Sequence, residues 1–424
     1  MSSSFEIREH VVEAQHIREY PRATAHSQEE VLYLAVKQYI PKNNPNPQPG
    51  DVTIIGAHAN GFPKELYEPM WEDLLKLSAT HGFRIRSIWI ADVACQGQSG
   101  IINESKLGND PSWIDHSRDL LHMINHFRTE MPRPLVGVGH SFGATTLTHL
   151  GLLHPRLLSA VVLMDPVMNF SSRGPSFGMD PMSLSAKRRD LWPSHQEAVD
   201  SFKKSKFYQS WDPRVLDAWI KYGIRTTPTL LYPDEKDAGK ATLTTTKHME
   251  VFTYLRPLYQ AVDENGKRKM DSSKLPDITY SNIWKFGSGK FYRPEAPNTA
   301  MQLPQLRPSC LYIFGGTSAM STPSLRKEKL ELTGTGVGGS GGEKEGRVKE
   351  AVLEDVGHLV AMDRPKECAE FAASWIGAEV KRWRAEEEEL QSWWKKSLRE
   401  KQLIDDEWMG WVNEARDEAR KAKL

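Results

Sequence analysis

Short apolar runs alternate with segments of helical spacing along the first 165 residues. The apolar runs are typical of strands and lie at residues 30–40, 52–58, 83–92, 135–140 and 157–165. Between them, apolar residues at helical spacing predict helices over residues 64–82, 111–130 and 143–155, with Asp110 as a candidate cap for the second. This alternation indicates an α/β fold, a mostly parallel sheet with helices on both faces.

The alternation stops at Pro166. Residues 166–307 are rich in aromatic residues, methionine and proline, with few clear strands, and predict an inserted cap or lid over the sheet. The strand and helix rhythm resumes at 309–316, 346–358 and 365–383. The expected division is therefore a first core segment, the cap, a second core segment and a charged helical tail, at residues 1–165, 166–307, 308–383 and 384–424.

Composition narrows the classes of function. Lys+Arg and Asp+Glu number 55 each, so no basic excess points to nucleic acid or to an anionic membrane. The N-terminus is polar, and no apolar run approaches the length of a membrane span. The three cysteines form no close pair, so we expect neither a disulfide framework nor a zinc site.

The last three residues are Ala422, Lys423 and Leu424. They resemble the Ser-Lys-Leu address that the peroxisomal import receptor reads. We expect localisation to the peroxisomal matrix, with that receptor as a partner. The alternative is a charged helix that happens to stop there.

A serine between two glycines marks the clearest chemical motif. In "LVGVGHSFG" (135–143), Ser141 follows a predicted strand and precedes a predicted helix. Gly139 and Gly143 are small enough for a tight turn, and the helix N-terminus favours developing negative charge. This is the G-x-S-x-G nucleophile pattern. The alternative is an ordinary glycine-rich turn.

A serine hydroxyl needs a base, which must follow the last strand in the chain order serine, acid, histidine. His358, in "VLEDVGHLVAMDRP", follows such a strand and precedes a helix. The alternative is a histidine that only occupies a loop. His58 and His140 also adjoin strand ends but occupy other motif positions.

The acid is expected to orient the base. The loop after the strand at 309–316 has no carboxylate near the strand end, whereas Asp165 ends the strand at 157–165. We therefore predict Asp165, against the alternative of a turn cap before Pro166. Asp355 and Asp363, close to the base in sequence, are weaker candidates.

The loop after the early strand is expected to complete an oxyanion hole. It reads "GAHANGFP" (56–63), and the amides of Asn60 and Phe142 are the predicted donors. Ala59, Gly61 and Phe62 are predicted to contact the substrate. The alternative is a plain turn. A serine, a base and an acid predict two-step acyl transfer to water, without a metal or an organic cofactor.

These motifs together resemble the α/β-hydrolase superfamily along nearly the whole chain. A closer likeness is to a fungal subfamily of peroxisomal acyl-CoA hydrolases that act in mycophenolic acid and host-selective-toxin biosynthesis. The stretches that carry it are "HIREYP" (16–21), "PKELYEPMW" (63–71), "MPRPLVGVGHSFG" (131–143), "LRPSCL" (306–311) and "GVGGSGG" (336–342). The resemblance implies the α/β-hydrolase fold and the triad Ser141, Asp165 and His358.

The resemblance also implies hydrolysis of an acyl-CoA thioester in secondary-metabolite or toxin biosynthesis. Two departures bear on the substrate: the loop "HANGF" lacks a usual glycine at Ala59, and the cap matches only around "LWPSHQEA" and "WDPR". An esterase or lipase acting on oxygen esters is the alternative enzyme, and a non-catalytic ligand-binding protein is the alternative of another class. The oligomeric state is open, with a homodimer as one option. Residues 334–342 are expected to form a mobile loop rather than a phosphate cradle.

Overall fold

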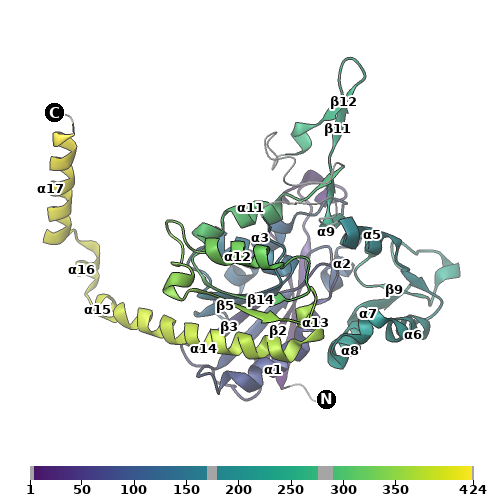
Figure 1. Cartoon of the computed structure of the whole chain (residues 1–424), viewed down its shortest axis with the longest axis horizontal. Helices are drawn as coiled ribbons and strands as arrows, with labels where there is room; N and C mark the ends of the chain where they lie inside the picture. Colours follow the sequence, from purple (N-terminus) through teal and green to yellow (C-terminus); the bar gives the residue numbers. More distant parts are fainter. Residues whose placement is uncertain (1–3, 170–178, 276–289, 423–424) are drawn as a thin grey trace. The chain divides into compact units, whose positions relative to one another are not determined.

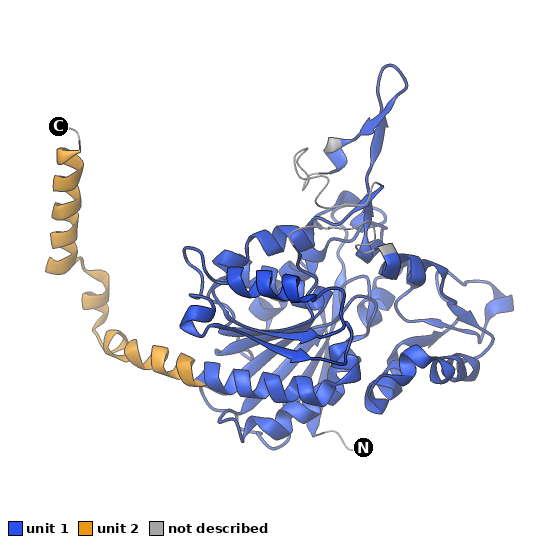
Figure 2. Cartoon of the chain, viewed as in Figure 1, with its two compact units in different colours: residues 1–380 blue, residues 381–424 orange. Residues whose placement is uncertain are grey.

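The computed structural model describes residues 4–169, 179–275 and 290–422. Its contacts divide the chain into two compact units, residues 1–380 and 381–424 (Figure 2). All motifs of the predicted active site lie in the first unit. The predicted division of this unit at residues 165 and 308 stays a prediction.

An eight-stranded sheet forms the centre of the first unit (Figure 1). Its strands, in spatial order, are β1 (Phe5–Glu13), β2 (Tyr33–Pro41), β4 (Ile85–Ala91), β3 (Val52–Ala57), β5 (Leu135–His140), β6 (Ala160–Met164), β14 (Ser309–Gly315) and β15 (Val348–Leu353). From β4 to β15 all neighbouring pairs are parallel, whereas β1 and β2 are antiparallel additions at one edge. The predicted α/β fold with a mostly parallel sheet is therefore confirmed.

Alternate residues of the central strands pack into two separate apolar cores, one on each face of the sheet. Val162 and Met164 of β6 pack toward α1 (Glu68–Ser78), α13 (Val360–Asp363) and α14 (Pro365–Glu389). Val161 and Leu163 pack instead toward α3 (Trp113–His126), α4 (Phe142–Leu153) and α12 (Pro323–Leu332). Helices on both faces explain why the strands are apolar throughout.

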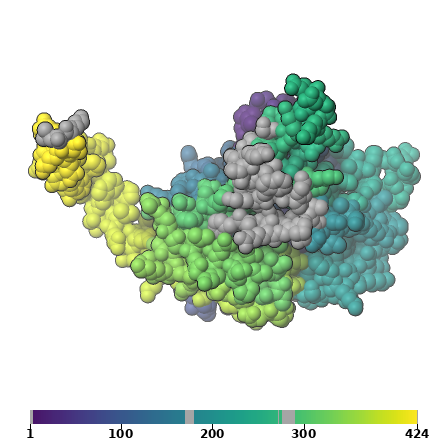
Figure 3. Space-filling model, turned by 45° about the horizontal axis from the view of Figure 1, so that its top comes forward, coloured from purple at the N-terminus to yellow at the C-terminus, as the bar shows by residue number. Residues whose placement is uncertain are grey.

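The predicted cap contains more strand than its sequence suggests. A three-stranded sheet joins β7 (Leu191–Trp192), β9 (Ala241–Leu243) and β8 (Ile224–Thr226), and two short antiparallel pairs follow it. The pairs are β10 (Arg256–Pro257) with β13 (Phe291–Tyr292), and β11 (Gln260–Val262) with β12 (Arg268–Met270). The cap helices are α5 (Met179–Lys187), α6 (His195–Lys204), α7 (Lys206–Gln209), α8 (Pro213–Tyr222) and α9 (Lys247–Tyr254), and α11 (Glu295–Met301) leads back to the core. In Figure 3 the teal surface of the cap lies beside the green surface of the later core residues.

The glycine-rich loop, residues 334–342, packs its backbone against residues 303–306. Gly334, Gly336 and Ser340 donate backbone hydrogen bonds to Leu303, Pro304 and Leu306. A Cβ atom at Gly339 would overlap the carbonyl oxygens of both Gly334 and Pro304. The glycines therefore permit close backbone packing, and the mobility of this loop stays a prediction.

The second unit is helical, and its Trp393, Trp394, Trp408 and Trp411 are exposed. Its helices after α14 are α15 (Gln391–Trp394), α16 (Leu398–Gln402) and α17 (Asp406–Lys421). The terminal residues Lys423 and Leu424, part of the predicted import signal, lie outside the described residues. Within the described residues, no helix is long and apolar enough to cross a lipid bilayer.

Candidate active site

Ser141 lies in a sharp turn between strand β5 and helix α4. Its backbone angles are φ 56° and ψ −117°, outside the regions that most residues adopt. A Cβ atom at Gly139 would lie 2.8 Å from the carbonyl carbon of Gly143, and one at Gly143 would overlap the carbonyl oxygen of Ala57. The turn that presents the serine therefore requires glycine on both sides.

The imidazole of His358 lies between Ser141 and Asp165. Ser141 Oγ is 2.7 Å from His358 Nε2, and His358 Nδ1 is 2.6 Å from Asp165 Oδ2. The three residues follow β5, β6 and β15, whose carboxyl ends lie along the same edge of the parallel sheet. Asp165 is fully buried, whereas the His358 side chain is 33% exposed, so the imidazole is open to solvent and the carboxylate is not.

The carboxylate of Asp165 is surrounded by donors. It accepts hydrogen bonds from the Gly315 amide at 3.1 Å, from Ser318 Oγ at 2.6 Å and from Ser321 Oγ. Burial alone would raise the pKa of Asp165, but the hydrogen bonds from His358, Ser318 and Ser321 outweigh burial and hold the pKa below its ordinary value. The carboxylate is therefore ionised at neutral pH.

The two weaker acid candidates bond elsewhere. Asp355 is an exposed side chain that pairs with Arg364 at 2.9 Å. Asp363 accepts a hydrogen bond from Ser210 Oγ at 3.2 Å. Asp165 is thus the carboxylate that the structure brings to His358.

The loop after β3 lies against the first turn of α4, as the close approach of Gly143 shows. The amide of Phe142 begins that helix, where backbone N–H groups have no acceptor in a preceding turn. The Ala59 N–H donates to Tyr67 Oη at 2.9 Å, whereas no acceptor for the Asn60 N–H is found among the described residues. Neither the Asn60 nor the Phe142 amide has an acceptor among the described residues, and their role as oxyanion donors stays a prediction.

Polar neighbours fix this loop. Gln96 Oε1 accepts from the Gly61 N–H at 2.8 Å, and Gln96 Nε2 donates to Asn60 Oδ1 at 2.7 Å. Asn60 Nδ2 in turn donates to the Glu250 carbonyl oxygen at 3.1 Å. Gly61 has φ 83°, and a Cβ atom there would lie 2.9 Å from the Glu250 carboxyl carbon. A side chain at Gly61 would therefore disturb both the loop and the cap above it.

Ala59 and Phe62 are placed differently from each other. Ala59 is buried, and the half-buried ring of Phe62 packs edge-on against Trp211 at 5.5 Å and Trp219 at 6.0 Å. Phe62 thus joins the oxyanion loop to the aromatic core of the cap. A direct substrate contact for Ala59, Gly61 and Phe62 stays a prediction.

This geometry agrees with a comparison against known families. The model of the "Alpha/beta hydrolase family" matches residues 54–371, most of the chain. This chain belongs to the alpha/beta hydrolase family.

Curated relatives place the chain within that family. It is 42% identical to "Type I acyl-CoA thioesterase mpaH" of Penicillium roqueforti, over 92% of this chain and 91% of the relative. It is 28% identical to "Abhydrolase domain-containing protein AFT2-1" of Alternaria alternata, over 58% of this chain and 84% of the relative. The solved structure of peroxisomal alpha-beta-hydrolase Lpx1 from Saccharomyces cerevisiae shares the fold, with 16% identity, a TM-score of 0.67, and coverage of 100% of this chain and 99% of that one.

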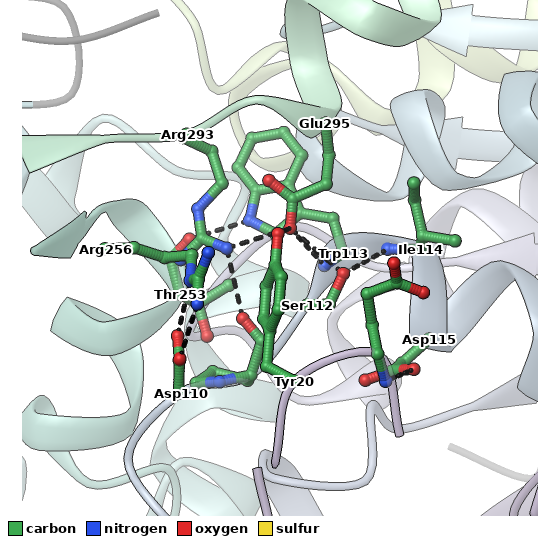
Figure 4. Close-up of polar contacts among 12 residues, drawn as sticks. Tyr20, Asp110, Ser112, Trp113, Ile114, Asp115, Thr253, Arg256, Arg293 and Glu295 are labelled. Carbon is green, nitrogen blue, oxygen red and sulfur yellow. Dashed lines mark hydrogen bonds and ion pairs between the residues drawn. The ribbon is translucent and has the colours of Figure 1, made fainter. Parts of the chain in front are cut away.

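In this α/β hydrolase, helix α9 of the cap lies over the oxyanion loop and is anchored to the core at its C-terminal end. Trp113 Nε1 donates to the Thr253 carbonyl oxygen at 2.7 Å, and an Arg293 nitrogen donates to the Phe252 carbonyl oxygen at 2.6 Å (Figure 4). Both side chains are buried. The core thus holds the C-terminal end of α9, at residues 252–253.

A buried ion pair extends this anchor (Figure 4). Asp110 accepts two hydrogen bonds from Arg256, at 2.6 and 2.7 Å, and the guanidinium lies 3.3 Å from the ring centroid of Tyr20. Asp110 is therefore not the cap of α3. Ser112 takes that position and accepts from the Ile114 amide at 3.3 Å.

A cavity of about 530 Å³ opens beside α9 in this α/β hydrolase. Its lining includes Arg22 and His248 together with the apolar Leu107, Met249 and Phe252. Leu107 and Met249 also pack against the cluster that contains Phe142. One wall of the cavity therefore packs against the apolar cluster that includes Phe142.

Proposed function

We propose that this chain is a serine hydrolase that cleaves an acyl-CoA thioester into a free acid and CoA. The contacts of His358 with Ser141 at 2.7 Å and Asp165 at 2.6 Å carry the hydrolase part of the proposal. The thioester part is supported by relatives that are named acyl-CoA thioesterases and align over more than nine tenths of both chains.

The first half of the reaction forms an acyl-enzyme. His358 Nε2 takes the proton of Ser141 Oγ as the oxygen attacks the thioester carbonyl carbon. The amides of Asn60 and Phe142 stabilise the resulting oxyanion. When the intermediate collapses, the carbon–sulfur bond breaks, and the imidazolium gives its proton to the sulfur of the departing CoA.

The second half releases the acid. A water molecule loses a proton to His358 as it attacks the acyl carbonyl carbon, and collapse returns the proton to Ser141 Oγ. Asp165 accepts a hydrogen bond from Nδ1, which keeps Nε2 free to act as the base and stabilises the imidazolium. The donors around Asp165 keep it ionised through this cycle.

A panel of acyl-CoA thioesters tests the proposal, with the released thiol as readout and the matching methyl esters as controls. We expect a higher kcat/KM for at least one thioester than for its ester. A clear preference for the ester would favour the esterase alternative. Turnover of neither class, together with tight binding of a panel member, would favour the non-catalytic alternative.

We expect the cavity beside α9 to hold part of the substrate, and the Met249→Trp variant tests this. The larger side chain would fill part of the space near Phe142 and raise KM for bulky acyl-CoA substrates by about tenfold or more. KM for a short acetyl ester should change little. Equal effects on both substrates would place the substrate elsewhere.

We also propose import into peroxisomes through Ala422, Lys423 and Leu424, supported by their likeness to a known import signal. A fluorescent fusion that leaves this C-terminus free should colocalise with a peroxisomal marker. The same fusion without the three residues should be diffuse.

A further inference from the structure

His140, the residue before the nucleophile, lies buried between the base and the oxyanion loop. Its Nε2 is 2.9 Å from the carbonyl oxygen of His358, and its Nδ1 is 3.0 Å from Tyr67 Oη. Tyr67 Oη is also 2.9 Å from the amide nitrogen of Ala59. The side chains of His140 and Tyr67 therefore link Ala59, at the start of the oxyanion loop, to the main chain of the base.

The direction of each hydrogen bond follows from chemistry. The carbonyl oxygen of His358 can only accept, so Nε2 of His140 carries the hydrogen. In a neutral ring Nδ1 then accepts, and the hydroxyl of Tyr67 donates to it. The Ala59 N–H can only donate, and it donates to the Tyr67 oxygen. All groups in the chain of bonds are satisfied in this one arrangement.

Both side chains stay neutral at working pH. Burial, with a smaller effect from the neighbouring His358, lowers the pKa of His140 to about 4. Burial likewise raises the pKa of Tyr67 above its ordinary value. Protonation does not disturb the bond directions near neutrality.

We propose that His140 and Tyr67 are positioning residues that couple the oxyanion loop to the base. Asp165 orients the His358 ring through Nδ1, and His140 holds the main chain of the same residue through its carbonyl oxygen. Tyr67 bonds both to His140 and to the Ala59 amide, and so connects His140 to the loop whose Asn60 amide is the proposed oxyanion donor. The inference rests on the proposed serine hydrolase chemistry but not on the acyl-CoA substrate.

This coupling matters because the base and the oxyanion donors act on the same reacting carbonyl group. A displacement of about 1 Å in either costs a large factor in rate, on the order of 10². One continuous chain of hydrogen bonds keeps the two at a fixed separation. It also gives a specific reason for histidine at a position that the nucleophile motif leaves variable.

The Tyr67→Phe variant tests the proposal, with Tyr39→Phe as the matched control. Tyr39 is also fully buried, and its hydroxyl donates to the Glu68 carboxylate at 2.9 Å rather than to His140. We expect kcat for a p-nitrophenyl ester to fall about tenfold or more in Tyr67→Phe, with KM changed less than about twofold. The control should keep its kcat, and the two melting temperatures should be similar. A kcat in Tyr67→Phe that matches the control would overturn the proposal.

A double-mutant cycle separates coupling from two independent structural roles. His140→Leu removes both ring nitrogens, whereas His140→Gln keeps an amide donor for the His358 carbonyl oxygen and should retain more activity. If the chain of hydrogen bonds acts as a unit, a double variant of Tyr67→Phe with either His140 substitution should be no slower than the His140 variant alone. Multiplied losses would overturn the coupling. If His140→Leu does not fold, His140→Gln takes its place in the cycle.

The rate at which a fluorophosphonate labels Ser141 provides a second readout. It reports the reactivity of the serine and its base without any acyl substrate. Slower labelling in Tyr67→Phe than in Tyr39→Phe is expected. An unchanged labelling rate would count against the positioning role of His140 and Tyr67. Because labelling needs no acyl substrate, this outcome is distinguishable from a failure of the acyl-CoA thioesterase proposal.

Discussion

At the scale of single residues, the backbone is strained at two members of the proposed triad. Ser141 has φ 56° and Asp165 has φ 40°, and each such residue costs about 1–3 kcal/mol. Both follow a sheet strand directly and present their side chains to His358. At these two positions the strained backbone lies where the proposed chemistry needs side chains at the edge of the sheet.

The Ser141→Ala variant is expected to abolish turnover. Loss of the nucleophile costs about 10⁶ in kcat in a well-studied serine protease. The hydroxyl has one side-chain contact, so its removal should shift stability by no more than about 1 kcal/mol and the melting temperature by a few degrees. Thiol release and calorimetry measure the two effects. Hydrolysis at the native rate would remove Ser141 from the mechanism.

The Asp165→Asn variant is expected to lower kcat by about 10⁴, because an amide mispresents the imidazole. The neighbouring Ser318 and Ser321 would still fill the space around the amide. KM should stay close to native. Asp355→Asn is the matched control because its partner is the exposed Arg364, and it should be near native. If the two variants lost activity to the same extent, the acid role would need reassignment.

Local sequence patterns were sufficient to select the residues that the structure brings together at the triad. Ser141 and Asp165 adjoin strand ends, and the chain order located His358. Ser318, Ser321 and Tyr67 were missed, because serines and tyrosines in ordinary loops carry no local signal of the groups they contact. Only the long-range fold brings Ser318 and Ser321 to a carboxylate more than 150 positions earlier.

At the scale of elements, the central strands were predictable because both of their faces are buried, which leaves short continuous apolar runs. Strand β1 was missed because it lies at the sheet edge, where Ile7 and Val11 are exposed and polar residues are tolerated. Cap strands of two or three residues are too short to show an alternation of apolar and polar residues in the sequence. The cap's attachment also depends on pairs such as Asp110 and Arg256, which are 146 positions apart.

The Arg256→Met variant tests this attachment. It leaves the buried Asp110 carboxylate without its guanidinium partner, and breaking a buried pair in this way costs about 3–5 kcal/mol. Arg8→Met is the control, since Arg8 pairs with Glu6 where both side chains are more than half exposed, and should cost about 1 kcal/mol or less. Urea unfolding measures both. Equal losses would show that the buried pair is not a significant anchor of the cap.

At the scale of the whole molecule, the chain concentrates its proposed chemistry in one of its two units. The contacts of Ser141, Asp165, His358 and the oxyanion loop described above all come from residues 1–380. The second unit, residues 381–424, has exposed Trp393, Trp394, Trp408 and Trp411 and carries the predicted import signal. We therefore expect that residues 381–424 can be removed to test their role without loss of activity.

Truncation after Leu390, one residue beyond the end of α14, removes α15, α16 and α17 but leaves the buried part of α14 intact. Because the contacts of the site described above all come from residues 1–380, kcat/KM should stay within about twofold of the full chain. Sedimentation of both forms shows whether the exposed tryptophans join two copies, and a full-length dimer that becomes a monomer on truncation would assign that role to the tail.

A tenfold or larger loss of kcat/KM on truncation would instead mean that the tail contributes to the active site, either of its own chain or of a second copy. Mixing the truncated enzyme with a full-length Ser141→Ala chain would distinguish these, since recovery of activity requires that the tail act on a neighbouring chain.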